Sequence, residues 1–295
     1  MCRFKSGIIL KNKIVIAPED NESHSDLLES LGIKDDYIGA SKTFVRAELV
    51  PKKDDEWWID PAEKPEKWVF VVDQDIIPDW FDKETHEKEF RESVCDWWRK
   101  HVLVDKKLEE LKTGFYRLKR CEVKKLLNDV RVMLDSSQVG EMWGSSQVGV
   151  MLDSSQVGVM LDSSQVGKMW GSSQVGEMCD SSQVGEMCDS SQVGKMWGSS
   201  QVGKMWGSSQ VGEMWGSSQV GVMLDSSQVG KMCDSSQVGV MLDSSQVGKM
   251  WGSSQVGEMW DSSTARDFKN YPVIKIMIPD GGKFEMVVHK SKDEE

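Results

Sequence analysis

A nine-residue unit repeated back to back constrains this chain more than any other feature. The unit x-M-[WLC]-[DG]-S-S-Q-V-G runs from Val132 to Gly257, and its SSQVG core recurs fourteen times without a change. A broken fifteenth copy, EMWDSSTAR, fills Glu258 to Arg266. Serine, glycine and glutamine at this density also occur in disordered tracts. Valine and methionine at fixed positions in every unit instead predict a regular fold with a continuous apolar stripe.

Short strands joined by tight turns fit this unit better than a helix does. Nine residues make about two and a half helical turns, and two glycine-type breaks per unit would destabilise a helix. Stacked strands would pair each backbone group with the coils above and below. Over residues 137–144, where the first unit passes into the second, the pattern predicts that Ser137, Val139 and Met142 point inward. Trp143 would point outward, and the chain would turn at Gly140–Glu141 and again at Gly144.

The residue before each methionine indicates how many units form one coil. Equivalent positions of adjacent coils lie about 4.7–4.9 Å apart, so like charges there are penalised. Two units per coil give five opposite-charge contacts and one like pair, Lys231 with Lys249, whereas three units per coil give three of each. The charges therefore predict an eighteen-residue coil. About seven such coils would form a mainly β solenoid about 33–34 Å long.

Both ends of a solenoid expose strand edges, so capping segments are expected. At the carboxyl-terminal end, Tyr271 to Ile278, a PDGG turn and Phe284 to Val288 predict a capping β-hairpin. At the other end, Cys121 to Val132 predicts a degenerate first coil. The sequence thus divides into an α+β domain over residues 1–120, a β-solenoid over 121–266, and a capping hairpin with a tail over 267–295.

The segment before the repeats predicts a small α+β domain. Ser25 is expected to cap a short helix that ends at Gly32, and a longer amphipathic helix is expected from Asp82 to Val102. The polar, proline-bearing stretch from Lys52 to Glu66 is expected to be a loop. Four strands are expected over Phe4–Leu10, Lys13–Ala17, Thr43–Val50 and Trp68–Val72.

Charge and composition exclude several classes of function. A formal net charge of −12 makes phosphate backbones a poor partner, so nucleic-acid binding is not expected. The apolar run Gly7–Leu10 is too short for a signal peptide or a membrane span, and a soluble, cytoplasmic protein is expected. Six cysteines without a C-x-x-C pair predict reduced thiols rather than a zinc or redox motif. No cofactor is expected.

Three segments of the amino-terminal part resemble a group of phage proteins. The segments are MCRFKSGIIL at Met1–Leu10, IKDDYIGASKTFVRAELVP at Ile33–Pro51 and VDQDIIPDWF at Val72–Phe81, and the nonapeptide array follows them. Over most of its length, the chain resembles uncharacterised proteins from phages and prophages of gut bacteria. The resemblance implies a phage origin and the same two-part layout. That group has no assigned activity, so the resemblance transfers no functional residue.

Seven tryptophans share one outward-facing position of the repeat: Trp143, Trp170, Trp197, Trp206, Trp215, Trp251 and Trp260. In an eighteen-residue coil, Trp197 and Trp215 would stack directly on each other. An exposed aromatic patch on a rigid support is typical of a binding surface. Alternatively, the rings cover the flank of the solenoid itself or the amino-terminal domain. The sequence supports both interpretations.

Other candidate sites have simpler explanations. The repeat lacks the GGxGxDxUx loop of calcium-binding β-rolls, and its Asp/Gly position fits a turn that accepts either residue. Asp73 and Asp75 could imitate the carboxylates of a metal nuclease, but an acidic turn after a strand is the commoner explanation. The four histidines are scattered along the chain. No metal site is expected.

These features favour a non-catalytic protein that presents a rigid solenoid to a protein partner, which would be host-derived for a phage protein. They are also compatible with a homo-oligomer. One alternative is an enzyme that uses Cys2 as an amino-terminal nucleophile after removal of Met1. Another is an acidic mimic of DNA, because residues 133–261 carry a net charge of −9. That charge amounts to about one per 4 Å of rod, against about one per 1.7 Å on duplex DNA.

Overall fold

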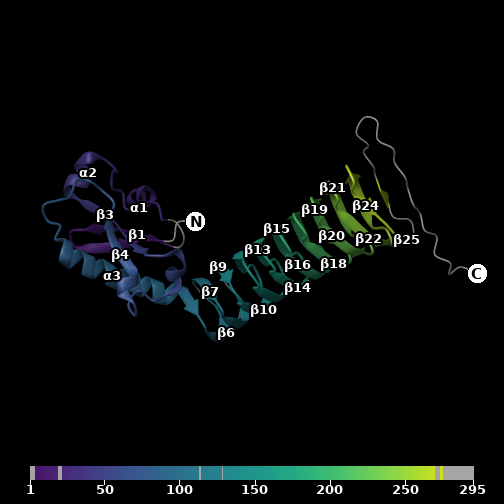
Figure 1. The fold of residues 1–295 in the computed structure, drawn as a ribbon, viewed down its shortest axis with the longest axis horizontal. Coiled ribbons are helices and arrows are strands. Elements are labelled where there is room, and N and C mark those ends of the chain that lie inside the picture. The colour runs from purple at the N-terminus through teal and green to yellow at the C-terminus, as the bar shows by residue number, and fades with distance from the viewer. Residues whose placement is uncertain (1–3, 19–21, 113, 128, 270–272, 275–295) are drawn as a thin grey trace, which may run out of the picture. The chain divides into compact units, whose positions relative to one another are not determined.

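The computed structural model describes residues 4–18, 22–112, 114–127, 129–269 and 273–274. The chain forms two compact units, and the boundary between them lies between Val102 and Leu103. Each unit has its own sheets (Figure 1).

The first unit is built on a four-stranded antiparallel sheet with the strand order β2-β1-β3-β4. Its strands confirm the four expected from the sequence, to within one residue at each end. The bounds are Lys5–Leu10 for β1, Lys13–Ile16 for β2, Phe44–Pro51 for β3 and Trp68–Val72 for β4.

Helices cover both faces of this sheet. On one face, Ile8 of β1 packs with Leu27 and Leu28 of α1 (His24–Ser30), and the short α2 (Tyr37–Lys42) adds Ala40 to the same cluster. Neighbouring residues of a strand point to opposite faces. Accordingly, Gly7 faces α3 (Lys83–His101), and a Cβ at Gly7 would lie 2.9 Å from the ring of Phe90.

Three local details differ from the sequence-based expectations. The side chain of Ser23, not Ser25, caps α1 by accepting a hydrogen bond from the backbone N–H of Asp26. Helix α2 was not expected. The expected loop contains two 3-10 turns, η1 (Asp54–Trp58) and η2 (Pro65–Lys67), and Trp57 of the first is buried.

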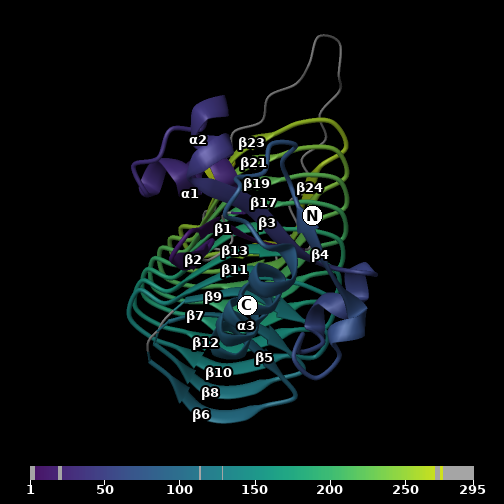
Figure 2. The same ribbon diagram turned by 90° about the vertical axis from the view of Figure 1, so that its left-hand side faces the viewer.

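The second unit is a solenoid of two parallel sheets, each with eleven strands. One sheet, called the even-numbered sheet below, holds the even-numbered strands from β6 to β24 and also β25: β6 (Lys107–Leu111), β8 (Glu122–Leu126), β10 (Gln138–Met142), β12 (Gln156–Met160), β14 (Gln174–Met178), β16 (Gln192–Met196), β18 (Gln210–Met214), β20 (Gln228–Met232), β22 (Gln246–Trp251), β24 (Thr264–Ala265) and β25 (Phe268–Lys269). The other holds β5 (Val102–Val104), β7 (Phe115–Lys119), β9 (Asp129–Leu134), β11 (Gln147–Met151), β13 (Gln165–Met169), β15 (Gln183–Met187), β17 (Gln201–Met205), β19 (Gln219–Met223), β21 (Gln237–Met241), β23 (Gln255–Met259) and β26 (Val273–Ile274). In Figure 2, the odd-numbered strands of the solenoid follow one below another from β23 to β7.

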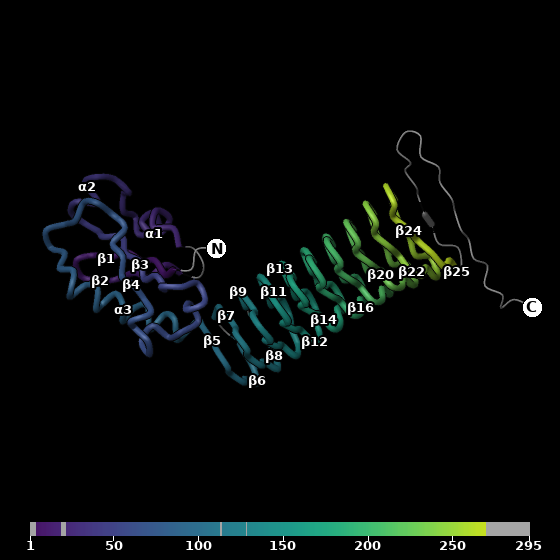
Figure 3. The backbone as a smooth tube through the Cα atoms, viewed as in Figure 1, coloured from purple at the N-terminus to yellow at the C-terminus, as the bar shows by residue number. Residues whose placement is uncertain are grey.

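The strand register confirms the eighteen-residue coil. Each strand pairs in parallel with the strand two units later, so that Glu177 lies beside Lys195, and Lys231 beside Lys249. Successive units therefore alternate between the two sheets, and the backbone rises coil by coil (Figure 3). The solenoid has about nine turns rather than about seven, because residues outside the perfect repeats also form coils.

The interior consists of the residues predicted for it. In every perfect unit the second serine, the valine and the methionine are buried, with exposed fractions of 0–3%. Each buried valine or methionine side chain contributes about 1.5–3 kcal/mol of hydrophobic stabilisation. The buried side chains of successive units form one continuous core from Leu111 to Met259.

The expected turn at Gly140–Glu141 is wrong. Strand β10 runs straight through both residues, and the strand pairing skips only Gly140. Because two residues separate Val139 from Met142, simple alternation is interrupted here, yet both side chains point inward. Each unit therefore turns once, at its Asp/Gly position.

The glycine of QVG is required by the distance between coils. A Cβ added to Gly158 would lie 2.5 Å from the carbonyl oxygen of Gly140 one coil earlier, and a Cβ on Gly203 would lie 2.5 Å from that of Gly185. A carbon atom cannot approach an oxygen so closely, so any larger residue would force the coils apart. The same contact recurs in every perfect unit, at 2.4–2.6 Å.

The Asp/Gly position is a left-handed turn, as the sequence indicated. Aspartates here have φ of 54–58° and glycines 63–69°. Asp and Gly tolerate this conformation better than other residues do. The carboxylates of all these aspartates except Asp135 also accept a hydrogen bond from the backbone N–H of the equivalent turn one coil earlier, as Asp162 does from Gly144 at 2.9 Å. The carboxylate of Asp135 accepts from the side chain of Arg120 instead.

The solenoid extends beyond both expected limits. It begins with β5 (Val102–Val104), at the boundary between the two units and about one coil before residue 121, and β6 and β7 pair in parallel with β8 and β9. At the other end, Val273–Ile274 pairs in parallel with β23 and so continues the solenoid. The remaining residues of the expected capping hairpin lie outside the described residues.

We expect the variant Gly203→Ala to be destabilised by about 1–3 kcal/mol, the usual cost of overpacking, because its methyl group would meet the Gly185 carbonyl. Thermal and urea unfolding followed by circular dichroism measure this loss. An unchanged unfolding midpoint would show that the coils can move apart without cost.

The variant Ser200→Ala in the same unit is the matched control, with the opposite expectation. The Ser200 hydroxyl is fully buried and finds no hydrogen-bond partner in the described part of the chain. Because a buried hydroxyl without a partner is unfavourable, its removal should leave stability unchanged or raise it by up to about 1 kcal/mol. A clear loss in the same unfolding experiment would mean that this hydroxyl makes a stabilising hydrogen bond.

Candidate functional site

The residue after each methionine points away from the valine and methionine core of the solenoid, in one column per sheet. On the strands β10 to β22 of one sheet the column carries Trp143, Trp197, Trp215 and Trp251, of which Trp197 and Trp215 are neighbours and the others are separated by leucine or cysteine. On the odd-numbered strands it carries Trp170, Trp206 and Trp260. The seven tryptophans thus point outward as predicted, but they are divided between two flanks.

These indole rings remain accessible in the folded chain. Trp143, Trp170, Trp197, Trp206 and Trp251 are 37–44% exposed, and Trp215 and Trp260 are half-buried. Most aromatic side chains of a stable fold are covered more fully. Partial exposure means that each ring covers some of the solenoid flank and still presents an edge.

On the outer surface of the even-numbered sheet, Trp197, Trp215, Lys231 and Trp251 form a row of ring contacts. Trp197 and Trp215 stack with ring centroids 5.4 Å apart and an angle of 14° between planes, as the coil length predicted. The Lys231 ammonium lies 4.5 Å from the Trp215 ring centroid and 4.2 Å from that of Trp251. A cation between two indoles is held by both ring faces, with about 0.5–1 kcal/mol for each contact at an exposed position.

The residue two positions before each tryptophan decides whether its indole N–H has a partner. In the three Glu-Met-Trp units, the glutamate accepts this N–H: Glu141 from Trp143 at 2.8 Å, Glu213 from Trp215 at 2.9 Å and Glu258 from Trp260 at 3.2 Å. The other four tryptophans follow Lys-Met. Their indole N–H groups have no hydrogen-bond partner among the described residues: Trp170, Trp197, Trp206 and Trp251.

Two of these Lys-Met-Trp units also present a lysine without an ion-pair partner in the described part of the chain. Lys168 and Lys195 pair with glutamates of adjacent coils, at 2.9 and 4.0 Å. Lys204 and Lys249 have no such pair. One flank therefore presents Lys204 with Trp206, and the other presents Lys249 with Trp251.

The alternating Glu and Lys columns cancel most of each other's charge. Glu186 lies between Lys168 and Lys204 along the odd-numbered sheet, and Lys195 lies between Glu177 and Glu213 along the other. These two columns of Glu and Lys therefore carry no continuous line of negative charge, and the negative charge of the solenoid comes mainly from the aspartates at its turns.

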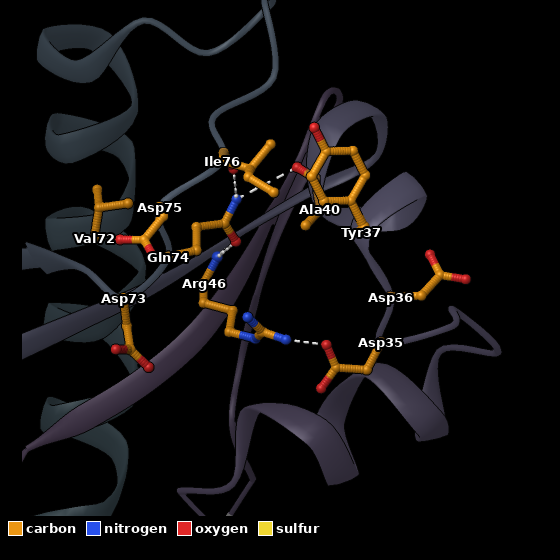
Figure 4. Close-up of a pocket in the computed structure, with 10 residues that line it drawn as sticks. All are labelled: Asp35, Asp36, Tyr37, Ala40, Arg46, Val72, Asp73, Gln74, Asp75 and Ile76. Carbon is orange, nitrogen blue, oxygen red and sulfur yellow. Dashed lines mark hydrogen bonds and ion pairs between the residues drawn. The ribbon is translucent and has the colours of Figure 1, made fainter.

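An acidic pocket of about 590 Å³ lies in the first unit, beyond the carboxyl end of β4 (Figure 4). Gln74 organises it: its side-chain oxygen accepts from the backbone N–H of Arg46 at 2.8 Å, and its side-chain nitrogen donates to the carbonyls of Phe44 at 3.1 Å and Ile76 at 2.6 Å. Arg46 forms an ion pair with Asp35. Asp73 and Asp75, the carboxylates noted in the sequence, both line this pocket.

Asp73 also belongs to the one group of three metal-capable side chains found among the described residues, with His24 and Glu48. Their ligand atoms all lie within 4.8 Å of one another, and His24 Nδ1 lies 3.3 Å from Asp73 Oδ2. His24 is buried at the start of α1, Glu48 is half-buried on β3, and Asp73 is exposed after β4. Burial raises the pKa of Glu48, His24 lowers it, and the carboxylates of Asp73 and Glu22 raise it further.

The described cysteines are buried or half-buried in the folded chain. The five described cysteines are free thiols, as expected, and burial raises the pKa of Cys121, Cys179, Cys188 and Cys233. A raised thiol pKa lowers reactivity. Cys2, the candidate nucleophile, lies outside the described residues. Of the helices described, none is long and apolar enough to cross a bilayer.

Comparisons with protein-family models, with curated proteins and with solved structures gave no match to this chain. The geometry above therefore carries the functional argument.

Stacking of Trp197 on Trp215 predicts a coupled signal of the two indoles in the far-ultraviolet circular dichroism spectrum. Trp197→Ser and Trp215→Ser should each abolish it, because either change removes one ring of the pair. Trp206→Ser should leave it intact, because its column neighbours one coil away are Cys188 and Leu224. Equal effects of all three variants would contradict the stacking.

Proposed function

We propose that this chain is a non-catalytic interaction protein of phage type that binds a protein partner through the Lys-Met-Trp units on the flanks of its solenoid. The observation that carries this proposal is the set of indole N–H groups without partners at Trp170, Trp197, Trp206 and Trp251. The resemblance of three amino-terminal segments to phage proteins would place the partner in the host and the protein in the host cytoplasm.

The chemistry of these units favours a partner that offers carboxylates beside apolar residues. Lys249 and Trp251 together present an ammonium group, an indole N–H donor and an aromatic edge. A carboxylate accepts from both donors, and charge-assisted hydrogen bonds of this kind are stronger than neutral ones. Tryptophan is enriched among the residues that dominate binding energy in protein interfaces.

The solenoid supports this role through rigidity. Each coil is fixed by backbone pairing to its neighbours and by a buried Val and Met core. The side chains on the flank are therefore held at a constant spacing of about 4.8 Å per coil, and little conformational entropy is lost when a partner binds.

The test compares two double variants in binding to a host lysate and then to the recovered partner. Trp206→Ser with Trp251→Ser removes one open indole N–H from each flank, and should weaken binding about thirty-fold for each site that the partner contacts. Trp143→Ser with Trp260→Ser also removes one tryptophan from each flank, but these indoles already donate to their own glutamates. This control should bind normally.

Salt provides the second measurement. Because Lys204 and Lys249 are expected to contact carboxylates, affinity should fall as ionic strength rises, and Lys204→Gln with Lys249→Gln should remove much of that dependence. Equal loss of binding in both tryptophan double variants would show a general need for aromatic surface. Unchanged binding in both would contradict the proposal.

A further inference from the structure

We propose that His24, Glu48 and Asp73 form a binding site for a divalent first-row transition-metal ion where the start of α1 meets strand β3 and the end of β4. This inference is independent of the interaction surface on the solenoid. It departs from the sequence-based expectation of no metal site, because the three residues come from separate segments of the chain.

The orientation of the His24 ring is the first argument. Its Nε2 lies 3.2 Å from the backbone carbonyl oxygen of Ala47 and is buried. A carbonyl oxygen can only accept, so Nε2 carries a proton and donates. In the neutral ring, the lone pair is then on Nδ1, which faces Asp73. Metal-binding histidines are held in this way, with one nitrogen donating to a carbonyl and the other bound to the ion.

The distances are the second argument. His24 Nδ1 and Asp73 Oδ2 are 3.3 Å apart, and two ligands on one tetrahedral Zn²⁺ are about 3.3–3.5 Å apart. The Glu48 carboxylate lies within 4.8 Å of both groups. A change of side-chain rotamer can move the Glu48 carboxylate toward the ion, since Glu48 is only half-buried and its carboxylate has no hydrogen bond or ion pair among the described residues.

The charges around the cluster are the third argument. Glu48 and Asp73 place two carboxylates beside one imidazole, whereas Glu22, the next carboxylate, is already paired with Lys5 at 2.8 Å. Two neighbouring carboxylates repel each other unless a positive charge lies between them. A divalent cation balances the two negative charges of Glu48 and Asp73.

The donor set indicates the class of metal. One imidazole nitrogen with two carboxylate oxygens suits Zn²⁺ and related first-row ions better than Ca²⁺, whose ligands are oxygens. Three protein ligands leave at least one position of a tetrahedral ion for water. Asp73 also lines the acidic pocket, so that position would be reachable from solvent.

The full-length chain, freed of metal with a chelator, should bind Zn²⁺ in a calorimetric titration. Asp73→Asn and Glu48→Gln keep the shape of each side chain and remove its charge. Each variant should weaken zinc binding at least about tenfold. Mutation of a residue that only hydrogen-bonds to a metal ligand already lowers metal affinity about 10–100-fold. Asp75→Asn changes a second exposed aspartate of the same pocket, and His86→Ala removes a histidine elsewhere, so both should bind as the unchanged chain does.

Nuclear magnetic resonance of the histidine rings identifies the ligand atom. Zn²⁺ should shift the Nδ1 resonance of His24 and leave His86 unchanged. Zinc held by the free thiols would leave His24 unchanged and would bind Asp73→Asn normally, and this result would overturn the site. No zinc binding at all would also overturn it. Circular dichroism verifies that each variant is folded. If Glu48→Gln does not fold, the zinc affinity of Asp73→Asn decides between the two outcomes.

Discussion

Contact between backbones of successive coils is the constraint on which the solenoid depends. At the glycine of each QVG segment, the carbonyl of one coil lies where a Cβ of the next would be. Because the backbones are so close, the residues before and after this glycine pair in register with the next coil, although the glycine itself is skipped in the pairing. The spacing then fixes everything outside it: the stacked indoles, the alternating charges and the hydrogen bonds between turns all follow from coils one strand apart.

Much of the solenoid was predictable because its units are nearly identical. The charge before each methionine revealed the coil length, since unlike charges one coil apart attract. The error at Gly140–Glu141 arose from applying a two-residue period to a strand whose inward residues, Val139 and Met142, are three apart. The same spacing occurs in Leu108 with Leu111 and in Val123 with Leu126, which also point inward or pack on the core. It was therefore the available signal for the coils before the perfect repeats.

The outward position of the tryptophans was predictable from the same pattern, but their chemistry was not. Whether an indole N–H has a partner depends on glutamate or lysine two residues earlier, and only the side-chain geometry makes that rule visible. The cluster of His24, Glu48 and Asp73 was harder still. Its members start a helix, lie within β3 and follow β4, so their meeting depends on how α1 packs on the sheet and on the pairing of β3 with β4, neither of which leaves a trace in a single sequence.

Assignment of alternate units to opposite sheets has a consequence for how such a chain can change in length. Gain or loss of two units adds or removes a full layer, and every later residue keeps its side of the rod. Gain or loss of a single unit would move every later tryptophan and lysine to the other side while leaving the dry core unaltered, because both sheets bury the same serine, valine and methionine. Slippage between repeats in the gene could thus exchange the two surfaces in one step without loss of folding, with the parity of the unit number as the inherited variable.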